Sequence, residues 1–331
     1  MANLETQYAG LRLKNPLIVG SSSLTSNAIN LKKFEKAGAA AVVLKSIFEE
    51  EILHEFQDIL ATAKDKGEQD HNLDYYDYKI KEDNIADYIA LIKSAKKELS
   101  IPVIASVNCV SSHEWLYFLS KIEEAGADAV ELNIFYFPAD FENSSKKIEK
   151  RYLKIIKKAK ESVSIPVVVK MSPYFTNLGA MIQQVSEEGA DGITLFNRFY
   201  KPDINLEKRE ITTADIFSSP NEYVIPLQWV ALMKDRIKTP MAASTGIHDG
   251  ASFVKLLLAG AQANYIVSGI FKHGATVITE ILDYLNSYLD QNNFESVNDI
   301  IGLLSQGNIA NPKAYERMQF MKYFSDRKDV I

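Results

Sequence analysis

The sequence predicts a (β/α)8 barrel, because two short phrases alternate along the chain and together delimit eight strands. In one phrase a helix ends in Ala-Gly-Ala or a close variant and a short apolar strand follows, as in EKAGAAAVVLKS at 35–46. In the other a proline precedes the strand, as in SIPVVVKMSP at 164–173. A glycine past the last turn ends a helix, and a proline prevents a helix from continuing. Both phrases therefore mark the junction between a helix and the next strand.

Each predicted strand is short and mostly continuous in apolar residues, which is typical of parallel strands buried on both faces. Segments with helical periodicity lie between the strands, for example 84–99, 145–163 and 251–258. An open doubly wound sheet is the alternative, but the count of eight and the absence of Gly-x-Gly-x-x-Gly after the first strand favour the closed barrel. The predicted strands are Leu17–Gly20, Ala41–Leu44, Val103–Ser106, Ala129–Leu132, Val167–Val169, Gly192–Phe196, Met241–Ala243 and Tyr265–Val267.

Extra length follows three even-numbered strands, at 48–83, 135–147 and 198–226, and so falls on the face that carries the site in this fold. In the first of these insertions, DYYDY at 74–78 is interpreted either as a lid over the site or as a solvated loop, together with Asp87 and Tyr88. We expect one domain over 1–331, with 293–331 as a C-terminal helical extension of two helices. The first of these helices, ESVNDIIGLLS, opens with a capping box of Ser296 and Asp299.

Composition excludes several classes of function. The 331 residues carry a formal net charge of −6, and Lys and Arg are scattered, so nucleic acid is not an expected partner. The N-terminus MANLETQYAG has no basic region followed by an apolar run, so no signal peptide or membrane anchor is expected. Cys109 is the only cysteine, which excludes an internal disulfide or an all-cysteine metal site. We expect a cytoplasmic protein that acts on a small molecule and needs no metal.

Every predicted strand ends in a polar group, on the face where barrels carry their sites. An asparagine in such a place is equally common as a turn or helix cap. A lysine that closes the apolar run VVVK is harder to explain structurally, because a charge beside the interior needs an anionic partner or a lowered pKa. The strand-end residues are Ser21, Ser22, Lys45, Asn108, Asn133, Lys170, Asn197, Ser244, Thr245, Gly246, Ser268 and Gly269.

Two lysines and three asparagines around one barrel mouth can hydrogen-bond to a planar ring with several amide-like edges. A flavin is such a ring, and a lysine at its N1 side stabilises the negative charge of the reduced form. The turns at 244–246 and 268–269 offer hydroxyls and backbone N–H groups where barrels usually bind phosphate. Flavin mononucleotide (FMN) is therefore the expected cofactor.

These residues resemble the class 1 dihydroorotate dehydrogenases, which are FMN-dependent barrels. The resemblance runs over about residues 4–285, and it is most specific in NPLIVGSS, VLKS, VELNI, VVKMSPYF, LFNR, STGI and IVSGI. It implies Lys45 near flavin and substrate, Asn133 and Asn197 near ring and substrate, and Lys170 at flavin N1. We also expect Arg198, from LFNR, to bind substrate. Gly246, Ser268 and Gly269 would hold the phosphate, and the expected assembly is a homodimer that serves pyrimidine biosynthesis.

The chain departs from this family where the catalytic base is expected. Family members follow the fourth strand with Asn-Leu/Ile-Ser-Cys/Ser-Pro-Asn, in which the Cys or Ser takes a proton from dihydroorotate. Here 133–139 reads NIFYFPA, so Tyr136 occupies the base position. A tyrosine has a reference pKa of about 10 and donates protons more readily than it accepts them. We predict poor oxidation of dihydroorotate and a preferred reaction in which Tyr136 protonates an unsaturated substrate; an aromatic lid is the alternative.

Three other interpretations stay open. One is a flavin oxidoreductase acting on a different small unsaturated or cyclic substrate. NLDYYDYKI at 72–80 stands where the family has its substrate loop, and Glu49–Glu51, which closely follow Lys45, are a poor setting for a carboxylate substrate. Another is a flavin-free lyase in which Lys170 forms a Schiff base. The third is a binding or assembly subunit that retains FMN without turnover. His248 and His273 near the last strand ends are expected to be surface residues, and Cys109 a small buried one.

Overall fold

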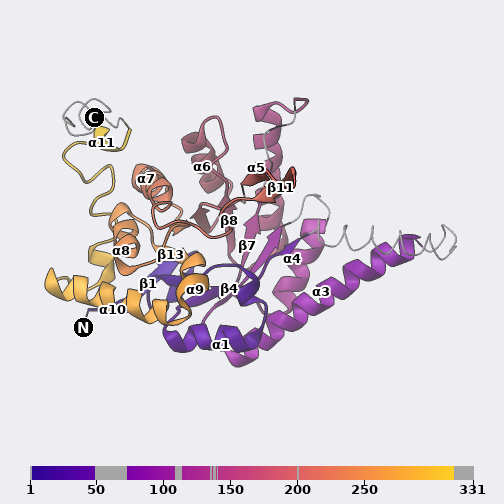
Figure 1. Ribbon diagram of the computed structural model, residues 1–331, viewed down its shortest axis with the longest axis horizontal. Coiled ribbons are helices and arrows are strands. Elements are labelled where there is room, and N and C mark those ends of the chain that lie inside the picture. Colours follow the sequence, from indigo (N-terminus) through magenta and orange to yellow (C-terminus); the bar gives the residue numbers. More distant parts are fainter. Residues whose placement is uncertain are drawn as a thin grey trace.

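The computed structural model describes residues 2–48, 73–108, 114–134, 136, 139, 141–199 and 201–316. Eight parallel strands form a closed barrel (Figure 1), in the order β4-β3-β13-β12-β9-β8-β7-β6, and the pairing of β4 with β6 closes it. Each predicted strand overlaps one of these, which confirms the fold. The strands are β3 Leu17–Val19, β4 Ala41–Val43, β6 Val103–Asn108, β7 Ala129–Asn133, β8 Val167–Met171, β9 Gly192–Leu195, β12 Met241–Ser244 and β13 Ala263–Ile266.

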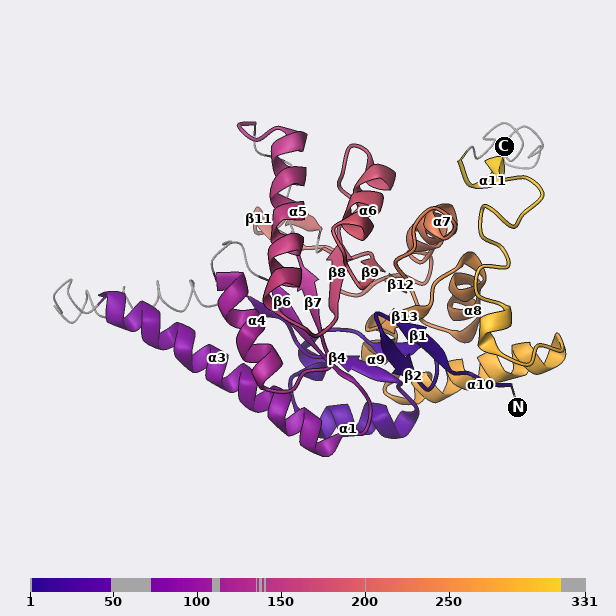
Figure 2. The same cartoon turned by 180° about the vertical axis from the view of Figure 1, so that it is seen from behind.

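Helices surround the barrel (Figures 1 and 2) and connect each strand to the next. Their ends follow ordinary capping chemistry: Asn27 caps α1, and Gly38 ends it in the left-handed conformation with φ of 113°. A short strand β5, Ile47–Phe48, lengthens the sheet beside β6. The helices are α1 Ala28–Ala37, α3 Leu73–Glu98, α4 Glu114–Glu124, α5 Ser145–Ser162, α6 Leu178–Glu187, α7 Val224–Met233, α8 Gly250–Ala259, α9 Ser268–His273 and α10 Thr276–Gln291.

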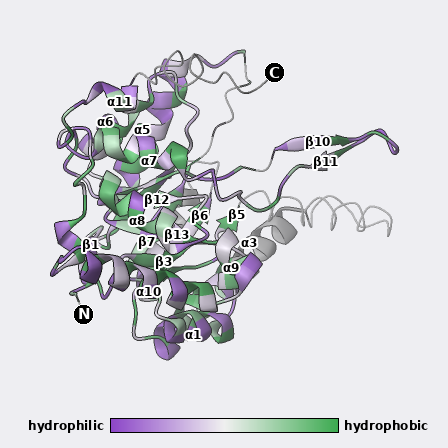
Figure 3. Ribbon diagram, turned by 60° about the vertical axis from the view of Figure 1, so that its left-hand side comes forward, coloured by the Kyte–Doolittle hydropathy of each residue, from purple (hydrophilic) through white to green (hydrophobic). Residues whose placement is uncertain are grey.

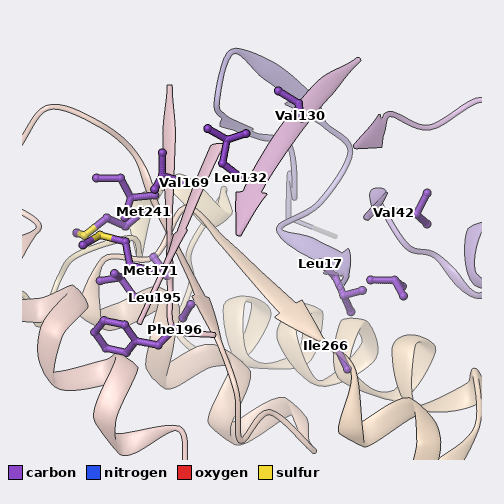
Figure 4. Close-up of a cluster of buried hydrophobic side chains, with 14 of the residues drawn as sticks. Leu17, Val42, Val130, Leu132, Val169, Met171, Leu195, Phe196, Met241 and Ile266 are labelled. Atoms are coloured by element: carbon purple, nitrogen blue, oxygen red, sulfur yellow. The ribbon is translucent and has the colours of Figure 1, made fainter. Parts of the chain in front are cut away.

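Side chains alternate between the outside and the inside of the barrel, and two buried clusters result. On β8, Val167, Val169 and Met171 pack outward in the larger cluster (Figure 4), whereas Val168 belongs to the inner cluster. Alternation then places Lys170 inside. Full burial of each aliphatic side chain stabilises the fold by roughly 1.5–3 kcal/mol. The polar residues at the strand ends then lie on the open face of the barrel, on the same side as Lys170.

An N-terminal hairpin closes the opposite end of the barrel. It consists of β1 Thr6–Tyr8 and β2 Leu11–Leu13, which pair antiparallel. Tyr8 is fully buried within the inner cluster. Gly192 makes room for it, because a Cβ there would lie 2.9 Å from the Tyr8 ring. The N-terminal residues therefore form the floor beneath the site.

A second hairpin extends from the insertion between β9 and α7 and projects away from the barrel (Figure 3). Its strands are β10 Pro202–Asn205 and β11 Glu210–Thr213. Ile204 pairs directly with Ile211, and these side chains are 65% and 83% exposed. Leu206, at the turn, is 85% exposed. The hairpin thus presents apolar side chains to solvent.

The prediction of a helix at ESVNDIIGLLS was wrong. The capping box of Ser296 and Asp299 forms, but it starts only a 3-10 turn at Val297–Asp299, and the chain then continues in turns. Gly302 takes φ of 85° and its N–H donates to Leu257, so the segment packs on α8 instead of continuing as a helix. The second predicted helix begins as α11, Lys313–Glu316, and its remainder lies outside the described residues.

The DYYDY run does not form the loop that was one of the two interpretations, because 74–78 belongs to the long helix α3. Tyr88, from the same helix, is buried in the core, where its hydroxyl donates to the Ser106 carbonyl at 3.0 Å and accepts from the Ser106 N–H at 2.7 Å. Among the described residues, no helix combines the length and apolarity needed to cross a membrane.

Candidate active site

A cavity of about 640 Å³ opens at the carboxyl ends of the strands. Its volume lies within the ordinary range for small-molecule sites. Of the strand-end residues that the sequence singled out, Gly269 alone is not part of its lining. The wall contains Ser21, Ser22, Lys45, Asn108, Asn133, Lys170, Asn197, Arg198, Ser244, Thr245, Gly246 and Ser268.

Lys170 lies at the bottom of this cavity and has the anionic partner that its position requires. Its Nζ lies 3.6 Å from Oε1 of Glu131, whose side chain is completely buried. Thr194 donates to the other carboxylate oxygen at 3.4 Å, and Tyr8 contacts the Thr194 hydroxyl at 3.1 Å. Sequence reasoning missed Glu131. The signal was available, because β7 reads AVELN and alternation puts Glu131 on the same face as Asn133.

Two amides flank Lys170 at the ends of the neighbouring strands. Asn197 Nδ2 donates to Asn133 Oδ1 at 2.6 Å, and the Asn197 backbone N–H donates to the Met171 carbonyl at 2.8 Å. This arrangement orients both amides. Asn133 keeps its N–H donors for a ligand, and Asn197 keeps its carbonyl acceptor.

A chain of serine hydroxyls connects the first three strands of the barrel. Ser21 Oγ lies 3.1 Å from Ser46 Oγ, which lies 2.7 Å from Ser106 Oγ. Ser22 caps the short 3-10 turn Ser23–Thr25. Lys45 and Ser46 follow β4, so this network holds the segment that carries Lys45 into the cavity.

The turn after β12 has the shape of an anion cradle. Thr245 and Gly246 both adopt positive φ, 87° and 77°, and a Cβ on Gly246 would lie 2.1 Å from the Tyr223 nitrogen. Such a conformation is costly for a β-branched residue and is typical of binding sites. The turn thereby brings Gly246 to the cavity edge.

Sequence reasoning also missed Ser218, which joins the two small-residue turns. The Gly246 N–H donates to Ser218 Oγ at 3.3 Å, and the Ser218 N–H donates to Ser268 Oγ at 3.0 Å. Lys272 donates to the Ser218 carbonyl at 3.0 Å. A phosphate accepts hydrogen bonds from groups of these kinds, namely hydroxyls, backbone N–H groups and lysine.

His248 is buried beside this cluster, so its expected surface position was wrong, whereas His273 is exposed as expected. The Nε2 atom of His248 lies 3.0 Å from Ser218 Oγ. Burial lowers the pKa of His248, and the positive charge of Lys272 lowers it further. The imidazole is therefore neutral at pH 7.

Arg198 lines the cavity but uses its guanidinium to fix the wall. Its Nε lies 3.1 Å from Glu222 Oε2, and its other nitrogens donate to the carbonyls of Ile216, Asp215 and Phe217 at 2.7, 2.8 and 3.1 Å. Burial raises the pKa of Glu222, but hydrogen bonds from Ser219 and Arg198 outweigh it and lower the pKa overall.

Tyr136 is not brought together with the other predicted residues. It lines a separate pocket of about 110 Å³, together with Tyr152, Ser172 and Phe175, and the Arg151 guanidinium lies 5.0 Å from its ring centroid. Position in the sequence fixes where its Cα lies but not the direction of its side chain. Phe135, Phe137, Glu49–Glu51 and Cys109 lie outside the described residues.

A barrel whose strand ends combine lysines, paired amides and a phosphate-type cradle is the architecture of a cofactor-dependent enzyme. The dihydroorotate dehydrogenase family model matches residues 75–289, more than half of the chain. The chain belongs to the dihydroorotate dehydrogenase family, whose members are oxidoreductases that act on CH–CH bonds and are in general flavin-dependent.

The chain is also similar to proteins named dihydroorotate dehydrogenase B (NAD(+)), catalytic subunit. It is 26% identical to that of Thermoplasma volcanium and 28% identical to that of Thermoplasma acidophilum, with 92% of this chain and 99% of each relative covered. The protein of that name from Pyrococcus abyssi is 27% identical over 91% of this chain and 98% of its own length. The similarity therefore extends over nearly the whole of each protein.

Proposed function

We propose that this protein is an FMN-dependent oxidoreductase that interconverts dihydroorotate, or a closely similar ring, and its unsaturated counterpart. The observation that carries the proposal is the convergence of Lys170, Asn133 and Asn197 at the bottom of one cavity in a member of this family. When bound, FMN supplies the hydride acceptor or donor, which no side chain can supply.

The donors in the cavity fit FMN. Lys170 and the two oriented amides suit the edge of a ring that becomes negatively charged on reduction. The cradle of Gly246, Ser218 and Ser268 suits a phosphate, and Gly246 must remain a glycine there because a Cβ has no room. These residues would hold the cofactor across the width of the barrel mouth.

Lys45 is the group that we propose to exchange a proton with the substrate. Tyr136 and Lys45 were the two catalytic candidates, and of these only Lys45 lines the cavity. An ammonium has three donors and no acceptor, so it delivers a proton to the substrate more readily than it takes one. This supports the reduction of an unsaturated ring as the favoured direction. Lys45, Asn133 and Asn197 would also hold the substrate's polar edge.

A reaction on another small unsaturated substrate is the second candidate, and the absence of the family's Cys or Ser base favours it. A Schiff-base lyase is less well supported. Its nucleophile must be an unengaged amine, whereas the Lys170 Nζ is paired with the Glu131 carboxylate at 3.6 Å.

The purified protein tests this proposal directly. We expect a flavin absorption band, release of FMN on denaturation, and anaerobic exchange of hydride with dihydroorotate or orotate. Colourless protein that fails to bind added FMN would reject the cofactor. Bound FMN that reacts with neither ring would move the assignment to another substrate, and a screen of unsaturated cyclic acids would follow.

We propose a homodimer as the assembly and the cytoplasm as the location. The exposed apolar residues of the β10–β11 hairpin support an interface, because large apolar side chains grouped on one projecting element usually mark a contact surface. A single cysteine suits a reducing compartment.

A further inference from the structure

Glu131 is a buried acid with few hydrogen bonds. It is completely inaccessible to solvent, its Oε1 has no hydrogen-bond donor among the described residues, and its Oε2 accepts only the long bond from Thr194. A buried carboxylate normally needs several donors or a close cation. Lys170, with Nζ at 3.6 Å, is the only cation paired with it in the part of the chain that the structure describes.

The other polar groups around Glu131 carry no charge. Burial raises the pKa values of Tyr8, Tyr265 and Tyr88 far above neutrality, so these phenols stay protonated. Thr194 is neutral as well. The electrostatic character of the cavity bottom is therefore decided by one negative and one positive group.

Only the positive member of the pair faces the cavity. Lys170 is 7% exposed and lines the cavity, whereas Glu131 does not line it. The separation of 3.6 Å gives an ion pair but not a hydrogen bond with good geometry, so the N–H donors of Lys170 stay available to a ligand. A ligand at the bottom of the cavity therefore contacts Lys170, while the Glu131 carboxylate lies behind this lysine, away from the ligand.

We propose that Glu131 is a positioning residue that sets the redox balance of the bound flavin by partly cancelling the charge of Lys170. This inference rests on the proposed function. A cation near the ring favours the negatively charged reduced form, and an anion directly behind that cation weakens the preference because the two Coulombic contributions have opposite sign. Buried ion pairs add little net stability, so the main consequence of this pair lies in the cavity.

The proposal predicts opposite effects for the two members of the pair. Glu131→Gln keeps the shape and removes the negative charge, so reduced FMN should be favoured about tenfold more, an upward shift of about 30 mV in the two-electron potential. Lys170→Met should lower the potential by a similar amount, because it removes the cation that favours the reduced ring. The double variant Glu131→Gln/Lys170→Met should return close to the parent value.

The experiment is an anaerobic equilibrium titration of each FMN-loaded variant against a reference dye, with the dissociation constant of oxidised FMN measured in parallel. Thr194→Val is the matched control, because it removes a bond to Glu131 without changing a charge, and its potential should stay near that of the parent. If Glu131→Gln folds poorly, the double variant, which leaves no unpaired buried charge, still tests the cancellation through its return to the parent potential.

The outcomes separate this inference from the proposed function. Variants that bind FMN normally and all share the parent potential would overturn the role of Glu131 while leaving the function intact. A parent protein that binds no FMN would overturn both. A shift in Thr194→Val as large as that in Glu131→Gln would assign the effect to packing and overturn the electrostatic account.

Discussion

Asn197 donates a hydrogen bond of 2.6 Å to Asn133 across the end of β8, so two amides from alternate strands act as one unit above Lys170. The bond orients both side chains before any ligand arrives. Binding then costs less side-chain entropy than it would with two independent amides.

Asn197→Ala should therefore weaken FMN binding by about tenfold, since it removes an acceptor and releases Asn133, a loss of about 1–1.5 kcal/mol. Asn292→Ala, on the exposed end of α10, is the control and should leave binding unchanged. Fluorescence titration of the apoprotein with FMN measures both. Equal affinity of the two variants would contradict the role of the amide pair.

Lys170→Ala should slow flavin reduction or weaken FMN binding by roughly 3 kcal/mol, about a hundredfold, because it removes a charge aimed at the developing negative charge. Lys33→Ala, on the exposed face of α1, should behave like the parent. Anaerobic stopped-flow kinetics together with binding titrations supply the comparison. Indistinguishable variants would mean that the ring does not lie over Lys170.

Lys45→Met should lower the rate of the hydride-transfer half-reaction by about 10²–10⁴-fold, the usual contribution of a positioned acid. Tyr136→Phe should change that rate less than threefold, because its ring lines a different pocket. The measurement is the rate of flavin oxidation by an unsaturated substrate and of flavin reduction by dihydroorotate. A large loss in Tyr136→Phe with Lys45→Met active would reverse the assignment.

The stability of the protein should depend on pH through His248. Because burial lowers the pKa of His248 in the folded state, the unfolded state binds more protons below its ordinary value of 6.5. The free energy of unfolding should therefore be fully present above about pH 6.5 and fall as the pH drops below that value. Urea unfolding of the parent and His248→Gln would show a smaller slope in the variant, with His273→Gln as the exposed control. Identical slopes would refute the assignment.

Ser substitutions at Ile204 and Leu206 should shift the protein from dimer to monomer, because they remove exposed apolar surface without touching the barrel. Sedimentation velocity over a range of concentrations measures the shift, and Ile29→Ser, at an exposed apolar residue of α1, is the control. A dimer that withstands both hairpin changes would place the interface elsewhere.

Much of the fold could be predicted from local signals, because a single glycine or proline at a helix–strand junction is enough to indicate that a helix ends there. Lys170 and Asn133 were predictable because each stands at the end of a predicted strand, Lys170 directly after the apolar run VVV. Ser218 was not, because it reaches the site from an insertion well beyond β9 and only tertiary contacts bring it to Gly246. Tyr136 lines a different pocket from Lys170, and the sequence gives the place of a residue in a loop but not the direction of its side chain. At Gly302 a single left-handed residue outweighed the helical pattern around it.

The burial of Tyr8 in the floor of the barrel has a consequence for how the protein is synthesised. Tyr8 is synthesised well before its partner Thr194, which follows 186 positions later. At ordinary synthesis rates that interval is on the order of ten to forty seconds. During that interval the N-terminal hairpin lacks its partner on β9, and Glu131 is synthesised before both Lys170 and Thr194. The floor of the barrel is thus begun early in synthesis and completed only when β9 has been made.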